Sequence, residues 1–148
     1  MINKTQYDEI YFIISHIFRL FGFGQVRPLT PEDVPEDVKK VVDCSSLTFV
    51  VMKQPEFPGG MNEFRKKFSE NFDATPLKAS DAALKTTIYF VVEPDGTVNR
   101  IIAVGDNDEL NKEAERTIKS INAKYEPAQV NNMAVRYLMR FPLSMNLK

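Results

Sequence analysis

The strongest constraint on the fold is a β-hairpin pattern in the second half of the chain. Residues 86–92 and 98–104 are rich in β-branched and aromatic side chains, and the sequence EPDG at residues 93–96 separates them. Proline fixes the backbone at the second turn position, and glycine tolerates the left-handed backbone that such a turn requires. The pattern therefore predicts two antiparallel strands, and turn formation explains both carboxylates of the EPDG sequence without a catalytic role.

A helical pattern lies on each side of this hairpin. Before it, apolar residues at three- and four-residue spacing predict an amphipathic helix with an aromatic core-facing stripe, formed by Met61, Phe64, Phe68 and Phe72. After it, Asp106 with Glu109 three residues later resembles a capping box at a helix N-terminus. The buried face of this second helix is expected to contain Leu110, Ala114, Thr117, Ile118 and Ile121, with Glu113 among the residues of its charged face.

Two further strands complete the predicted sheet. Residues 47–52 (LTFVVM) form a short β-rich run that ends before a turn rich in proline and glycine. Residues 134–145 are the longest strand candidate because apolar and polar side chains alternate, and the preceding Asn131 and Asn132 tolerate left-handed backbone. Pro142 cannot donate to a neighbouring strand, so it indicates an edge strand or an early end of pairing. The order β–α–β–β–α–β predicts an α+β fold with two helices on one face of an antiparallel sheet.

The N-terminal third differs from this domain, which we place at residues 47–148. Residues 1–24 contain an apolar run, 10–23, which is interrupted by Arg19 and is shorter than the about 20 residues that a membrane span needs. Three interpretations stay open: a signal or export segment, an amphipathic helix on a membrane surface, and a helix packed on the domain. Residues 25–46 alternate proline with acidic residues and are interpreted as a linker, with a short helix starting at Pro31 as the alternative.

The composition excludes several classes of function. Hydrophobic residues make up 43% of the chain, which suffices for one core, and the net charge of −1 leaves no basic surface for nucleic acid. One cysteine (Cys44) and one histidine (His16) cannot build a disulfide framework or a zinc site of the usual kind. No combination of nucleophile, base and stabilising group emerges from the pattern. We therefore expect neither enzyme activity nor a cofactor or metal.

Five motifs in order and spacing resemble the C-terminal domain of TonB proteins. They are QPEFP at residues 54–58, FVVEPDGTV at residues 90–98, the acidic start of the second helix, YEP at residues 125–127 and VRYLMRFPLSM at residues 135–145. The sequence FPGGM at residues 57–61 is particularly similar to TonB-like proteins of Bacteroidetes-type bacteria. The resemblance covers the domain proposed above.

This resemblance implies a periplasmic or envelope-located binding module for TonB-dependent transport, with inner-membrane association as a further alternative. Members of the family bind the N-terminal box of an outer-membrane transporter as an added strand, and they work with inner-membrane motor proteins. An exposed sheet edge offers unpaired N–H and C=O groups for such binding. The resemblance assigns the contact to Gln54 and to the closing strand, namely Val135, Arg136, Tyr137, Leu138, Met139, Arg140 and Phe141.

A second interpretation keeps the fold but not the energy coupling. The sequence shows no clear membrane helix and no long spacer rich in proline and lysine. It contains no tryptophan, which the family often has near the YEP motif. We therefore keep an envelope interaction module, or a homodimer joined through exposed strand edges, as the alternative function.

Overall fold

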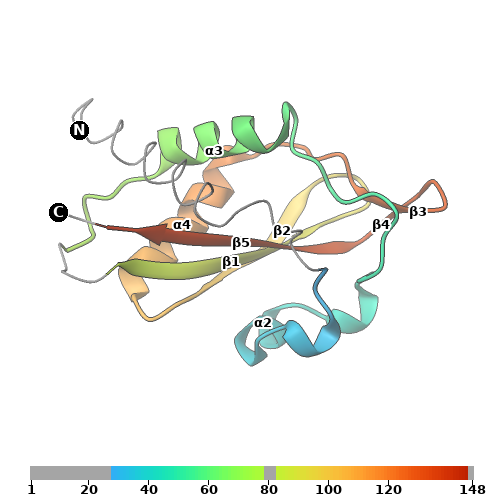
Figure 1. Ribbon diagram of the computed structural model, residues 1–148, viewed down its shortest axis with the longest axis horizontal. Helices are drawn as coiled ribbons and strands as arrows, with labels where there is room; N and C mark the ends of the chain where they lie inside the picture. The colour runs from blue at the N-terminus through green and yellow to red at the C-terminus, as the bar shows by residue number, and fades with distance from the viewer. Residues whose placement is uncertain (1–27, 79–82, 147–148) are drawn as a thin grey trace.

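The computed structural model describes residues 28–78 and 83–146 (Figure 1). These residues form the helices α2 (Glu36–Val41), α3 (Gly60–Asn71) and α4 (Asp108–Ile121), with 3-10 turns η1 (Pro31–Asp33) and η2 (Cys44–Ser46). The strands are β1 (Leu84–Val92), β2 (Val98–Val104), β3 (Ala128–Val130), β4 (Met133–Val135) and β5 (Tyr137–Met145). The fold is α+β, as predicted. The apolar run at residues 10–23 and its three interpretations lie outside the described residues.

An antiparallel sheet with the strand order β2-β1-β5 forms the centre of the fold. The predicted hairpin is confirmed, because β1 pairs with β2 from Val92 opposite Val98 onward, with a bulge between Tyr89 and Val91. β1 also pairs with β5 over its whole length, from Leu84 opposite Met145 to Val92 opposite Tyr137. The closing strand of the chain therefore lies beside the first strand of the hairpin.

Helices α3 and α4 cover one face of this sheet (Figure 1). The rings of Phe64 and Phe68 on α3 lie 5.0 and 5.5 Å from the ring of Phe141 on β5, measured between centroids. The predicted aromatic stripe is confirmed, except that Met61 is exposed. The same core contains the buried α4 side chains Leu110, Ala114 and Ile118.

Helix α4 departs from the prediction at its start and on its surface. Asn107, not Asp106, caps the helix, because its side-chain oxygen accepts a hydrogen bond at 2.7 Å from the N–H three residues later. Glu113, which we predicted on the charged face, is buried and accepts hydrogen bonds from the backbone N–H of Asp73 at 2.7 Å and from Arg116. These donors replace the water that the buried carboxylate loses. Glu113 thereby ties the end of α3 to α4.

The opposite face of the sheet is covered by residues 28–46, where we predicted a linker. Buried residues of this segment (Leu29, Val34, Val38 and Val42) pack against Tyr89, Val91 and Leu138 of the sheet. Only Val38 lies within α2, and Val34 and Val42 flank this helix in extended backbone, yet all three valines enter the same core. Pro35 does not break α2 because it precedes the first helical residue, where no hydrogen bond from its nitrogen is needed. A second, smaller core results.

The predicted strand at residues 47–52 is wrong. The chain bends at Val50 and Met52, and single bridges form further along instead, with Lys53 opposite Gln129 and Glu56 opposite Glu126. Pro55 lies between these two bridges and has no N–H with which to extend a ladder. Pairing of this segment is therefore limited to isolated bridges.

The predicted strand at residues 134–145 is divided into β4 and β5 at Arg136. β4 pairs with β3 across a turn at Asn131 and Asn132, whose φ angles of 49° and 63° confirm the predicted left-handed backbone. This short hairpin projects from the end of the sheet (Figure 1). Pro142 lies within β5, the last strand in the order β2-β1-β5, which agrees with the predicted edge position.

Candidate functional site

The site that the sequence predicted is built on β5, which pairs only with β1 among the described residues. Successive residues of a strand direct their N–H and C=O groups to opposite sides. Pro142 lacks an N–H and lies opposite Thr87 within the pairing, so it belongs to the set of residues that faces away from β1. Leu138, Arg140 and Ser144 belong to the same set. Their backbone groups are therefore directed to the outer side of the sheet.

The loop before α3 occupies only the beginning of this outer side. The N–H of Thr48 donates a hydrogen bond at 2.9 Å to the carbonyl of Arg136, just before β5 begins. Arg136 precedes Leu138 by two residues, so this bond agrees with the assignment of the outward-facing set. Within the described part of the chain, no backbone hydrogen bond joins the outer side of residues 138–144 to another segment.

Gln54 lies beside this edge. It lines a small hollow of about 40 Å³ together with Pro28, Leu29, Tyr137, Leu138, Met139 and Arg140. The Gln54 side chain is exposed, and its amide can both donate and accept hydrogen bonds. Gln54 and four of the predicted strand residues thus meet in one place. Pro28 and Leu29 were not predicted as part of this site. The only sequence signal for them is that the apolar Leu29 directly precedes Thr30, the N-cap of η1.

Arg140 supplies the charge of this hollow. It lies opposite Tyr89 in the register of the sheet, and its positive charge also acts on Tyr137. Burial raises the pKa of both tyrosines above the usual value, and the nearby guanidinium opposes that rise. Both phenols are therefore neutral near pH 7. Among the described residues, no carboxylate forms an ion pair with Arg140.

The side chains of the other predicted site residues, Val135, Arg136 and Phe141, do not line this hollow. The Arg136 Nε donates to the carboxylate of Glu93 at 3.0 Å, and both side chains are largely buried. Val135 lies in β4 rather than in β5. The Phe141 ring is buried against α3, and its backbone groups face β1 rather than the outer side of the sheet. The structure therefore brings Gln54 together with residues 137–140 but not with these three side chains.

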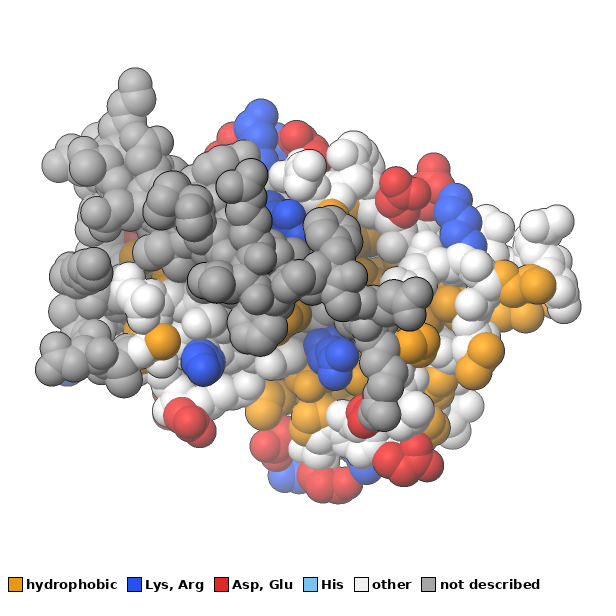
Figure 2. All heavy atoms as spheres, viewed as in Figure 1, with side chains coloured by type: hydrophobic (Ala, Val, Ile, Leu, Met, Phe, Trp, Pro, Cys, Tyr) orange, Lys and Arg blue, Asp and Glu red, His pale blue; other side chains and the backbone are white. Residues whose placement is uncertain are grey.

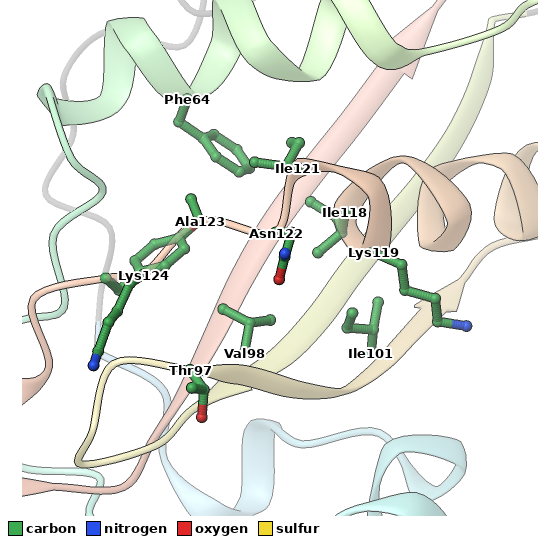
Figure 3. Close-up of a pocket in the computed structure, with 11 residues that line it drawn as sticks. Phe64, Thr97, Val98, Ile101, Ile118, Lys119, Ile121, Asn122, Ala123 and Lys124 are labelled. Atoms are coloured by element: carbon green, nitrogen blue, oxygen red, sulfur yellow. The ribbon is translucent and has the colours of Figure 1, made fainter.

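A larger hollow of about 230 Å³ lies between the end of α4 and β2 (Figure 3). The side chains of Val98, Ile101 and Ile118 face this space, whereas the ammonium groups of the two lysines at its rim point away from it. Tyr125 also lines the hollow, and burial raises the pKa of its phenol. Its walls offer apolar contact without a charged group directed at a ligand, so we do not place the functional site there.

Comparison with models of protein families, with curated proteins and with solved structures found no match. The resemblance to the TonB C-terminal domain therefore stays a prediction from motifs. The α+β class and the strand order come from the structure itself.

The described residues contain no group of three or more His, Cys, Asp or Glu side chains that could hold a metal ion. None of the helices in residues 28–78 and 83–146 is long and apolar enough to cross a membrane. What the β5 edge offers to a partner is a row of backbone donors and acceptors, with one amide and one guanidinium beside it.

Proposed function

We propose that this protein is a TonB-like periplasmic binding module that takes part in transport across the outer membrane. In this proposal it binds the box peptide of an outer-membrane transporter as an additional strand on the outer side of β5. One observation carries the proposal. The outward-facing backbone groups of residues 138–144 lie beside Gln54, which the motif resemblance assigns to the same peptide.

Main-chain hydrogen bonds would supply most of the affinity in this binding mode. On the outer side, Leu138, Arg140 and Ser144 each offer an N–H and a carbonyl, whereas Pro142 offers only a carbonyl. A hydrogen bond of this type contributes about 1 kcal/mol net, so several must form together before binding becomes measurable. Gln54 and Arg140 then select the register of the peptide through its side chains.

A peptide titration tests the binding mode. The full chain labelled with ¹⁵N is titrated with the box peptide of an outer-membrane transporter, and we expect amide shifts at Gln54 and along residues 137–144. A series of peptides carrying a single N-methyl group at each position extends the test. Strand addition predicts that the methyl group weakens peptide binding only when it stands at every second position, because only alternate peptide N–H groups face β5. Uniform effects along the peptide, or no binding at all, would contradict the proposal.

A matched pair of variants tests the edge from the side of the protein. Arg140→Pro removes one outward N–H at a position two residues from the natural Pro142, whereas Arg140→Ala removes the guanidinium and keeps the N–H. We expect the proline variant to bind the peptide at least about fivefold more weakly than the alanine variant, which corresponds to one lost hydrogen bond. Equal affinities, with equal thermal stabilities, would exclude main-chain pairing at this residue.

A third measurement distinguishes the transport role from the alternative function, an interaction module or homodimer without energy coupling. The immobilised full chain should retain an outer-membrane transporter with its box and lose it when the box is deleted. If the chain binds no transporter and instead forms a stable dimer, the interaction module with exposed strand edges becomes the better description. Sedimentation across a range of concentrations identifies that dimer.

A further inference from the structure

Three strongly exposed apolar side chains gather at the end of the molecule that carries the β3–β4 hairpin. Val50, Met52 and Met133 are 85%, 78% and 65% exposed. The loop that contains the first two is joined to β3 by a hydrogen bond at 2.9 Å from the N–H of Met52 to the carbonyl of Gln129. Figure 2 shows apolar side chains at the end where this hairpin projects in Figure 1. We name Val50, Met52 and Met133 the apolar tip.

The segments that carry the apolar tip hold no unpaired charge. Residues 47–54 and 128–136 contain no Asp or Glu, and their charged side chains are Lys53 and Arg136. Lys53 forms an ion pair with Glu126 at 2.6 Å, and Arg136 forms one with Glu93 at 3.0 Å. Transfer of the tip out of water therefore leaves no isolated charge to desolvate.

Part of the backbone that carries the tip is also hydrogen-bonded internally. Gln129 and Lys53 exchange two hydrogen bonds of 2.9 and 3.2 Å, and β3 pairs with β4 along its whole length. The N–H of Asn131 donates to the Sδ of Met52 at 3.4 Å. An apolar phase tolerates polypeptide only where such backbone groups are already paired. The N–H of Met52 and the β3–β4 ladder, which contains Met133, meet this condition.

We propose that the apolar tip inserts into the interfacial region of a lipid bilayer, independently of peptide binding at β5. The tip projects from the body of the protein (Figure 1), and none of its three residues lines either of the two hollows described above. The boundary between headgroups and acyl chains accepts projecting apolar side chains of this kind. A second copy of the chain fits less well, because three side chains cannot cover the about 1,000 Å² that a specific interface needs.

Tryptophan fluorescence reports on this insertion directly, because the chain contains no natural tryptophan. The Met133→Trp variant of the full chain is mixed with phosphatidylcholine–phosphatidylglycerol vesicles, with and without brominated acyl chains. We expect a blue shift of the emission and quenching by the brominated lipid. The Met61→Trp variant places the probe at an exposed position of α3, outside the tip, and should show neither effect.

Vesicle flotation supplies the second measurement. The triple variant Val50→Ser, Met52→Ser, Met133→Ser should partition to vesicles at least about tenfold more weakly than the natural chain. The control Val41→Ser, Met61→Ser removes exposed apolar side chains elsewhere and should partition like the natural chain. Circular dichroism establishes that both variants are folded.

Three results would overturn this proposal. The first is an emission of the Met133→Trp variant that vesicles leave unshifted and unquenched. The second is a blue shift that grows with protein concentration in the absence of lipid, which identifies contact between copies of the chain. The third is a triple variant that floats as well as the natural chain, which places membrane binding in another part of the protein.

Discussion

At the scale of the residue, Gly96 is the position that tolerates substitution least in the β1–β2 turn. Its φ of +84° is unfavourable for other residues, and a Cβ placed there would lie 2.1 Å from the carbonyl oxygen of Tyr125. The same close approach allows the N–H of Tyr125 to donate to the carbonyl of Gly96 at 2.8 Å. Gly96 therefore joins the turn to the chain that follows α4.

We predict that Gly96→Ala lowers the free energy of unfolding by about 3 kcal/mol or more, because backbone strain and a steric clash act together. Gly60→Ala is the matched control. Gly60 has a similar φ of +81°, but a Cβ placed there would meet no atom within 4 Å, so only the strain of about 1–2 kcal/mol remains. Urea denaturation of both variants checks this, and equal losses would show that the contact with Tyr125 is unimportant.

A second prediction at this scale concerns the acid range. The Thr97 hydroxyl and backbone N–H donate to the Asp95 carboxylate at 2.7 and 2.9 Å, and these hydrogen bonds lower the pKa of Asp95. A lowered pKa in the folded state contributes stability that is present above the unfolded pKa of about 3.9 and lost as the pH falls through the folded value. Stability should therefore decline below about pH 4.

Thr97→Val removes the hydroxyl donor and keeps the N–H, so the pKa of Asp95 should rise part of the way toward its ordinary value. The pH at which the decline begins is set by the unfolded state and should not change, but the loss of stability at acid pH should be smaller than in the natural chain. Asp73 and Thr75 form the same Asp-x-Thr arrangement elsewhere and serve as the internal control, since the pKa of Asp73 should not change. NMR titration of the side-chain carboxyl carbons measures both values, and an unchanged Asp95 pKa would contradict the assigned cause.

At the scale of the element, residues 28–46 belong to the folded unit through α2. Val38 is completely buried between this segment and the sheet, whereas Val41 on the same helix is exposed. We predict that Val38→Ala destabilises the protein by about 2 kcal/mol through lost burial and a small cavity. Val41→Ala should change stability by less than about 0.5 kcal/mol. Thermal denaturation distinguishes the two, and equal small effects would restore the interpretation of this segment as a linker.

Elements differ in how far local sequence determines them. The β1–β2 hairpin and the aromatic stripe of α3 were predicted because their signals lie within the segments themselves. The strand predicted at residues 47–52 was wrong because a strand forms only where a distant segment pairs with it. The segment that lies beside this loop, Glu126 to Gln129, forms bridges with Lys53 and Glu56 instead. Residues 28–46 were misjudged because proline suggested a connector, although Pro35 occupies the position before α2 that proline tolerates.

The candidate site shows the same division. The edge position of β5 was indicated by Pro142, whose missing N–H is a local property of the sequence. The proximity of Gln54 to β5 followed only from the motif resemblance, since no periodicity relates segments so far apart. Pro28 and Leu29 reach the hollow only because α2 folds back onto the sheet, and this contact has no counterpart in the local pattern.

At the scale of the whole molecule, the two cores enclose the sheet from both faces and leave its edges as the sites of open backbone pairing. β1 is paired on both sides, whereas β2 and β5 are each paired on one side among the described residues. Peptide binding at β5, as proposed, would therefore require no rearrangement of either core. The outward N–H groups of this strand would donate to the carbonyls of the peptide.

Hydrogen exchange tests this arrangement over the entire sheet. Amides of β1 should exchange most slowly, because both sides of this strand are paired and both faces are buried. Along β5 the inward amides of residues 137, 139, 141, 143 and 145 should be protected, whereas those of Leu138, Arg140 and Ser144 should exchange rapidly. A bound box peptide should slow only the latter group by at least about tenfold, because its carbonyls accept from them. Protection of Leu138, Arg140 and Ser144 before any peptide is added would mean that the edge is already covered, and strand addition at β5 would then be excluded.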